Sequence, residues 1–299
     1  MTFVMVNGSE ETPVYSRADW ISPWNKRIRV IAILTVGLAI CVAVFFALFS
    51  FDNSPFQVKP SVANSPYPTG IRDAIEPSGY APPAANALRG YSLAYVQDFT
   101  GTKVPPGWDI FNGVPGGDPG GHFSKEHVVV SNGLLELNTY KDPKYQNRWI
   151  TGGLCQCGLP RTYGAYFVRS RITGGGPNEV ELLWPASNIW PPEIDFNENG
   201  GSAVESSSTV HYGPINQIDQ RHVDINMTKW HTWGVIWTRK SLTFIVDGQV
   251  WATITSQAEV STVPMTLNFQ QLQECDEHRE CPTTPNTMDI DWVAEYSAK

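Results

Sequence analysis

Three carboxylates within six residues are the strongest chemical signal in the sequence. Glu193, Asp195 and Glu198 lie in the segment WPPEIDFNENGG, which begins at Trp190. Side chains alternate along a strand, so Glu193 and Asp195 share one face. Glu198 joins that face only if a β-bulge adds one residue between Asp195 and Glu198. Repulsion among crowded carboxylates raises the pKa of one of them, which leaves a protonated acid beside an ionised one. Such a pair could cleave a glycosidic bond by nucleophilic attack and proton donation.

The surroundings of the acidic segment decide between a working site and a solvated edge strand. The bare spacing is weak evidence, since acidic residues are common and an exposed strand could carry it without function. However, LLWPA at 182–186 and the Trp-Pro-Pro before Glu193 make this region apolar and aromatic. The segment is therefore interpreted as the floor of a cleft.

Short β-type runs separated by turn residues make up the rest of the C-terminal part. Asp247-Gly248 between two alternating runs predicts a type I′ hairpin. About a dozen such runs over roughly 200 residues indicate one all-β domain built from two packed sheets. The expected strands are 127–130, 134–137, 163–172, 179–184, 193–197, 208–212, 232–238, 242–246, 249–254 and 287–296.

Composition agrees with an all-β domain and excludes several classes of protein. Of the 299 residues, 12% are aromatic and only 17% are charged, which excludes wholesale disorder and coiled coils. The formal net charge is −8 and no Lys/Arg block is present, so nucleic acid is a poor partner. An acidic protein suits a neutral polysaccharide better than an anionic one.

An uncharged apolar run predicts a membrane anchor. Residues 30–51 are long enough to cross a bilayer, and Lys26, Arg27 and Arg29 precede them. The sequence therefore predicts a cytoplasmic tail (1–29), a transmembrane helix (30–51), a Pro-rich tether (52–90) and an extracytoplasmic domain (91–299). A cleaved signal peptide is the alternative, but its apolar region would be shorter.

Four of the five cysteines fall in the exported part, where disulfides form. Cys41 lies inside the predicted span. The other four allow three pairings, of which Cys275–Cys281 with Cys155–Cys157 is the simplest and the two cross-pairings stay open. A zinc site is disfavoured because the spacings do not fit.

The acidic segment and its neighbours resemble glycoside hydrolase family 16, the laminarinase-like group. The resemblance runs from about residue 96 to 296. Besides the E-x-D-x-x-E strand it rests on VQDF at 96–99, YGAYFVRSR at 163–171, HYG at 211–213, WHTWGVIW at 230–237, FIVDG at 244–248 and DIDWV at 289–293. It implies a two-sheet antiparallel jelly-roll sandwich, concanavalin A-like, with a concave substrate cleft.

The resemblance also implies a role for each carboxylate. Glu193 would be the nucleophile, Glu198 the general acid/base, and Asp195 would hold the nucleophile and tune its charge. The six-residue form with a bulge resembles laminarinases and agarases, which favours a β-1,3-glucan or galactan-type chain. The family's usual Met before the second Glu is Asn197 here.

Aromatic and polar residues near the acidic strand are candidates for sugar binding, although core packing is the commoner use of tryptophan. Trp233 and Trp237 are expected in the core. The candidate substrate-binding residues are Trp190, Trp149, Trp184, His211, Asn268 and Gln270. His211 could hydrogen-bond Glu198 or sugar.

A structural calcium ion is the one metal that the resemblance implies, at Asp98, the Gly133 carbonyl and Asp291, while catalysis requires no cofactor. The expected function is thus a membrane-anchored, retaining endo-β-glycanase. A transglycosylase using the same residues is one alternative. A carbohydrate-binding lectin is the other, and it is disfavoured because all three carboxylates are present.

Overall fold

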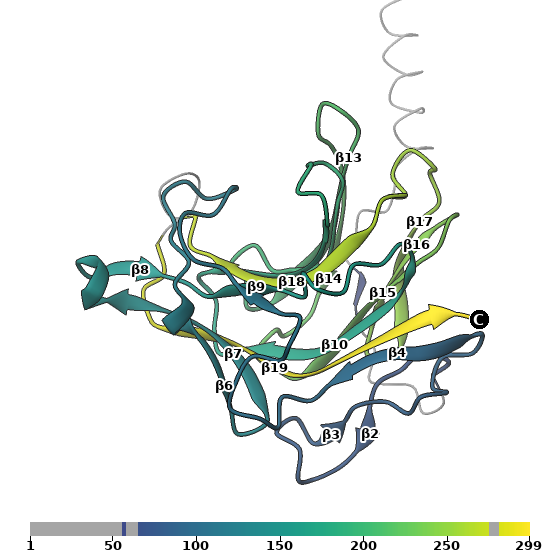
Figure 1. Cartoon of the computed structure of the whole chain (residues 1–299), viewed down its shortest axis with the longest axis horizontal. Helices are drawn as coiled ribbons and strands as arrows, with labels where there is room; N and C mark the ends of the chain where they lie inside the picture. The colour runs from purple at the N-terminus through teal and green to yellow at the C-terminus, as the bar shows by residue number, and fades with distance from the viewer. Residues whose placement is uncertain (1–55, 58–64, 275–280) are drawn as a thin grey trace, which may run out of the picture. The chain divides into compact units, whose positions relative to one another are not determined.

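The computed structural model of the chain describes residues 56–57, for which only the backbone is considered, together with 65–274 and 281–299. These residues form a sandwich of two large sheets, which Figure 1 shows as two stacked layers. All strand pairs in the sandwich are antiparallel except β1 with β14. The all-β jelly-roll fold predicted from the sequence is confirmed.

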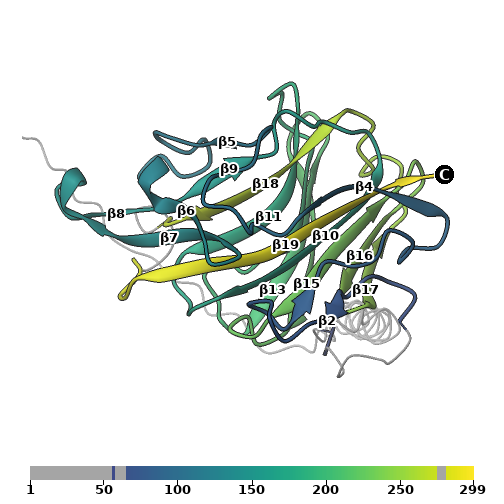
Figure 2. The same cartoon turned by 60° about the horizontal axis from the view of Figure 1, so that its bottom comes forward.

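The first sheet contains the acidic segment near its middle. Its order across the sheet is β1 (Phe56–Gln57), β14 (Gln217–Asp224), β13 (Glu205–Tyr212), β12 (Glu193–Glu198), β11 (Asn178–Pro185), β18 (Met265–Leu272), β9 (Gly153–Cys155) and β5 (Asp109–Ile110). Figure 2 shows β5, β9, β18 and β11 lying side by side. Neighbouring strands in such a sheet are about 4.8 Å apart, so residues in register form straight rows across it.

The second sheet supports the first from below. Its order is β17 (Gln249–Ile254), β16 (Leu242–Val246), β15 (His231–Trp237), β10 (Gly164–Ile172), β19 (Asn286–Ala298), β7 (Leu134–Asp142) and β6 (Val128–Ser131), with β4 (Tyr91–Gln97) paired to β19 and β8 (Arg148–Ile150) to β7. Two single-turn 3₁₀ helices cover Lys125–His127 and Pro143–Tyr145.

The core between the sheets is apolar because each strand turns alternate side chains inward. Ile194 and Phe196 of β12 are fully buried there, and so are Trp233 and Trp237, as predicted. The inward packing of Ile194 and Phe196 leaves the carboxylates of β12 on the opposite, outer face. Burial of large side chains contributes about 1.5–3 kcal/mol each, so the core fixes the orientation of β12.

The predicted hairpin at Asp247-Gly248 is confirmed. It joins β16 to β17, and both residues have positive φ, 46° and 77°, as a type I′ turn requires. Asn132-Gly133, with φ of 53° and 78°, turns the chain in the same way between β6 and β7.

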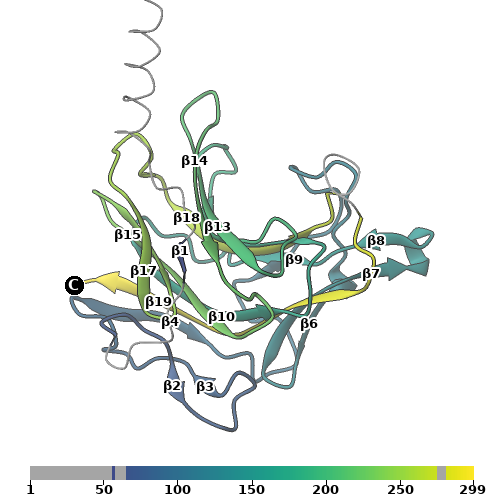
Figure 3. The ribbon, with the colours of Figure 1, turned by 180° about the vertical axis from the view of Figure 1, so that it is seen from behind.

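Residues 65–90 of the predicted Pro-rich tether pack against the second sheet. This segment forms a small two-stranded sheet, β2 (Ile71–Arg72) and β3 (Tyr80–Ala81), on the outer side of the second sheet (Figure 3). Trp292 donates its indole N–H to the Tyr80 carbonyl at 2.9 Å, and Leu88 is buried against the same face. The scattered apolar residues of 65–90 cover an outer face that would otherwise expose large aromatic rings.

Among the residues that the structure describes, no helix has the length and apolar character needed to cross a membrane. The predicted cytoplasmic tail and the predicted span at 30–51 lie outside the described residues.

Candidate active site

The three carboxylates line one cleft. The register of β12 against β13 shifts between Asp195 and Glu198, and its register against β11 shifts at the same place. The shift is the β-bulge that the sequence required, and it returns Glu198 to the face of Glu193 and Asp195. All three line a cavity of about 930 Å³ on the outer face of the first sheet.

Glu193 sits at the start of β12 and is almost buried, with 8% of its surface exposed. The Trp190 indole N–H donates to Glu193 Oε2 at 2.6 Å. Burial raises the pKa of Glu193, while His211 and the hydrogen bonds from Trp190 and Asp195 oppose that rise. These donors favour the ionised form, which is the form a nucleophile needs.

Asp195 is the most buried of the three acids. Burial, together with repulsion from Glu193 and Glu198, raises its pKa well above its usual range. A protonated Asp195 donates to Glu193 and leaves the single negative charge on Glu193. His211 Nε2 lies 3.7 Å from Asp195 Oδ2, and the ligand atoms of Glu193, Asp195 and His211 lie within 4.8 Å of one another, so this group could also bind a metal ion.

His211 lies on β13 in register with Glu193. Its Nδ1 is 2.8 Å from Asn216 Oδ1, and its ring packs against Trp190 with centroids 5.5 Å apart. His211 therefore faces Asp195 and Glu193 and not Glu198, because it is in register with Glu193 on β13.

Glu198 has a wetter environment than Glu193. It is only partly buried, and its two carboxylate oxygens each accept a hydrogen bond, Oε1 from Asn178 Nδ2 at 3.1 Å and Oε2 from Thr209 Oγ1 at 2.5 Å. Gln220 donates to the same Thr209 hydroxyl at 2.9 Å. Sequence reasoning missed Asn178 and Thr209. The alternation of 207, 209 and 211 along β13 was the available signal for Thr209.

Asn197 belongs to a buried polar chain beneath the bulge. Asn197 Nδ2 donates to Glu181 Oε1 at 3.1 Å, and Ser206 Oγ donates to Asn197 Oδ1 at 2.6 Å. Ser206 Oγ also accepts the backbone N–H of Glu198 at 3.2 Å, while Ser170 from the second sheet donates to Glu181. Burial raises the pKa of Glu181 to about 8. A neutral Glu181 thus has a polar partner in Asn197 as well as in Ser170, where the family's usual Met would offer no hydrogen bond.

A comparison with protein families assigns the chain. The model described as "Glycosyl hydrolases family 16" matches residues 121–294, which is more than half of the sequence. The chain belongs to glycosyl hydrolase family 16. The enzyme class predicted from the sequence, a glycoside hydrolase, is thereby confirmed.

Relatives of this family 16 chain are distant. Glucan endo-1,3-beta-glucosidase A1 of Niallia circulans is 24% identical over 253 residues, 73% of this chain and 36% of that protein, so the chain spans about a third of its curated relative. Among solved structures, the laminarinase catalytic domain from Thermotoga petrophila has a TM-score of 0.61 at 20% identity, covering 70% of this chain and 98% of its own. The laminarinase from Rhodothermus marinus has a TM-score of 0.63 at 18% identity, covering 69% and 97%. These structures share the fold.

Most of the predicted substrate-binding residues of the family 16 domain reach the cleft. Trp184, Trp190, His211, Asn268 and Gln270 line the same cavity as the carboxylates. Trp190 is also 42% exposed, so its ring presents a face to solvent as well as its N–H to Glu193.

Trp149 does not join them. It lies on β8 with 9% of its surface exposed and lines a separate cavity, where Lys141 Nζ is 5.5 Å from the centre of its ring. Its place is set by the pairing of β8 with β7 of the second sheet, and its contact with substrate stays a prediction.

The residues expected to bind calcium are gathered around one segment. Asp291 Oδ2 accepts the Ser78 N–H at 3.2 Å, while Asp291 Oδ1 is buried without a partner among the described residues. Burial raises the pKa of Asp291, and the nearby charge of Asp98 adds to that rise. Gly133 lies against Pro77, the neighbour of Ser78. An unpaired buried oxygen among acids fits a hard cation that prefers oxygen ligands.

Proposed function

We propose that this domain is a retaining endo-β-glycanase that hydrolyses a neutral polysaccharide, of β-1,3-glucan or galactan type. The observation that carries the proposal is the placement of Glu193 and Glu198 on one cleft face in different environments. The buried Glu193 receives donors that favour its ionised form, and Glu198 is only partly buried, with hydrogen bonds from Asn178 and Thr209. The curated relative, named as an endo-1,3-beta-glucosidase, supports the glucan.

The mechanism follows from these positions. Glu193 attacks the anomeric carbon and forms a covalent glycosyl ester, while Glu198 gives its proton to the departing glycosidic oxygen. Glu198 then removes a proton from water, which attacks the same carbon and releases Glu193. Before the attack, Asp195 donates its hydrogen bond to the Glu193 carboxylate, which orients the nucleophile, and it can do so again when hydrolysis releases that carboxylate. Two inversions give net retention, and no cofactor enters either step.

Hydrolysis of a polysaccharide panel tests the proposal. We expect the full chain, purified in detergent, to release oligosaccharides from β-1,3-glucan or a galactan with retained anomeric configuration, measured by NMR of the first products. Products longer than the substrate would indicate transglycosylation. Binding to a polymer without turnover on any polymer tried would contradict the proposal and support a lectin.

The membrane anchor remains part of the proposal, because residues 30–51 form an uncharged run with cations on one flank. The domain would then act outside the cytoplasmic membrane. Extraction of the full chain from membranes by detergent but not by high salt tests this, and release by salt alone would contradict it.

We also propose that Asp98, Asp291 and the Gly133 carbonyl hold a structural calcium ion. The bound ion would neutralise the acids and tie residues 77–78 to the second sheet. Metal analysis of the purified protein tests the proposal, and full thermal stability in chelator with no bound calcium would contradict it.

A further inference from the structure

The Cys155–Cys157 disulfide lies on the wall of the catalytic cleft. This pairing excludes both cross-pairings, and both cysteines line the same cavity as the carboxylates. Cys155 is buried at the end of β9, whereas Cys157 is exposed. The backbone N–H of Gln156 between them donates to the Leu267 carbonyl at 2.8 Å, which ties the small loop to β18.

The strand register gives the distance between this disulfide and the carboxylates of β12. Asp195 is in register with Leu182, Leu182 with Asn268, and Asn268 with Cys155. Three steps between neighbouring strands span about 14 Å, roughly the length of three linked pyranose rings. The disulfide is therefore too far away to touch the reacting sugar, but it lies within reach of a bound chain.

Asn268, which is in register with Cys155, is an independent indication that a ligand binds beside the disulfide. It is only 4% exposed, it lines the cleft, and its Oδ1 is buried with no partner among the described residues. A buried amide oxygen without a donor is costly. A sugar hydroxyl lying between Leu182 and Cys155 would donate to it.

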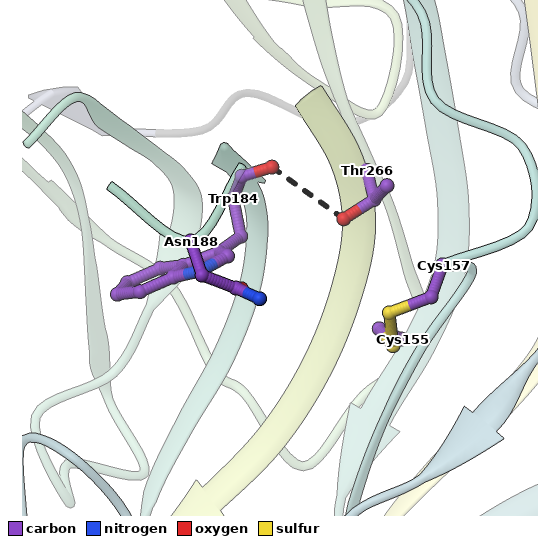
Figure 4. The surroundings of a disulfide bond; sticks show 5 residues. All are labelled: Cys155, Cys157, Trp184, Asn188 and Thr266. Carbon is purple, nitrogen blue, oxygen red and sulfur yellow. Dashed lines mark hydrogen bonds between the residues drawn. A yellow bond between two sulfur atoms is a disulfide. The ribbon is translucent and has the colours of Figure 1, made fainter. Parts of the chain in front are cut away.

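Figure 4 shows the side chains of the cleft that surround the disulfide. Thr266 lies between Trp184 and the disulfide, and its hydroxyl donates to the Trp184 carbonyl at 3.4 Å. The Trp184 indole N–H donates to Asn188 Oδ1 at 3.0 Å, which fixes the orientation of the ring. An apolar ring face and an apolar pair of sulfur atoms thus flank a polar strand.

We propose that the Cys155–Cys157 disulfide and Asn268 form a distal subsite for a neutral hexopyranose unit of the substrate chain. Asn268 Oδ1 accepts one hydroxyl, and the sulfur atoms pack against the C–H face of the same sugar. The disulfide closes a loop with one residue, Gln156, between the cysteines and holds Cys157 at the cleft wall, so reduction of this bond weakens the binding of long chains. The inference rests on the proposed function, because it assigns a position along the same substrate.

Substrate length separates this role from a structural one. The experiment compares kcat/KM for a short and a long β-1,3-linked glucose oligomer, for the wild type, C155S/C157S, N268A and the control S92A on the far side of the sandwich. We expect the long-to-short ratio to fall about tenfold in C155S/C157S and in N268A, through KM, as the loss of one sugar contact predicts. S92A should keep the wild-type ratio.

A reductant provides a second measurement. A thiol-free phosphine reductant should lower the ratio in the wild type and not in C155S/C157S, which isolates this disulfide from any other. Equal losses on short and long oligomers, or an unchanged ratio in N268A, would overturn the subsite. A wild type that cleaves neither oligomer nor any panel polymer would instead overturn the proposed function.

Discussion

Replacing Glu193 by glutamine is expected to lower kcat by about 10⁶-fold, the scale found when a hydrolase loses its nucleophile. The amide cannot form the glycosyl ester, although it keeps the shape of the side chain and can still contact Trp190 and Asp195. Initial rates on the active panel polymer measure the loss. Adding azide to E193A should restore turnover and give a glycosyl azide of inverted configuration, because the small anion attacks from the vacated side.

The acid limb of the pH–rate profile gives a further measure of Glu193. Only the ionised carboxylate attacks, and burial raises its pKa. Activity should therefore fall as pH decreases through that raised pKa, at a higher pH than for an exposed glutamate. D195N is the matched control, since it keeps a donor to Glu193 and removes an ionisable neighbour. D195N should lose less activity than E193Q, and full activity in E193Q would contradict the mechanism.

Simple alternation explains why so much of the site was predictable. The spacing of Glu193, Asp195 and Glu198 demanded a bulge if all three were to share one cleft, and the bulge is present. The positive-φ pair at Asp247-Gly248 followed from residue type alone. In both cases the physical constraint acts within a few residues, so the local sequence contains it.

Contacts between distant segments were not predictable in this way. The sequence of residues 65–90 does not reveal that this segment packs against Trp292 and Tyr296, because that contact depends on the twist and curvature of the second sheet. Thr209 meets Glu198 only because the bulge shifts the register of β12 against β13. His211 faces Asp195 because it is in register with Glu193 on the neighbouring strand, a pairing that a count along one strand cannot reveal.

The buried chain beneath the bulge shows what a departure from the family pattern can mean. Asn197 stands where the family usually has Met before the second glutamate. In the fold its amide links Glu181 to Ser206, and Ser206 holds the backbone N–H of Glu198. The Asn197 side chain therefore has two polar partners, Glu181 and Ser206, and Ser206 in turn accepts the backbone N–H of Glu198.

Replacing Glu198 by glutamine should produce a loss that depends on the leaving group. With the natural polymer, kcat/KM is expected to fall by about 10²- to 10⁴-fold, because the departing oxygen receives no proton. With a dinitrophenyl glycoside, whose leaving group needs no proton, kcat/KM should stay close to that of the wild type. Azide should raise kcat for E198A and give a glycosyl azide of retained configuration, which distinguishes Glu198 from Glu193.

The donors to Glu198 permit a graded version of the same experiment. Thr209 Oγ1 donates to Glu198 Oε2 at 2.5 Å, so T209V removes one hydrogen bond while T209S keeps it. If Thr209 positions the acid, T209V should lose activity on poor leaving groups and much less on good ones, and T209S should recover it. If T209V lost the same activity on poor and on good leaving groups, Thr209 would have a structural role in β13 and no role in positioning the acid. If E198Q lost the same activity on poor and on good leaving groups, Glu198 would not be the general acid. Loss of a proton donor slows most the departure of the leaving group that most needs protonation.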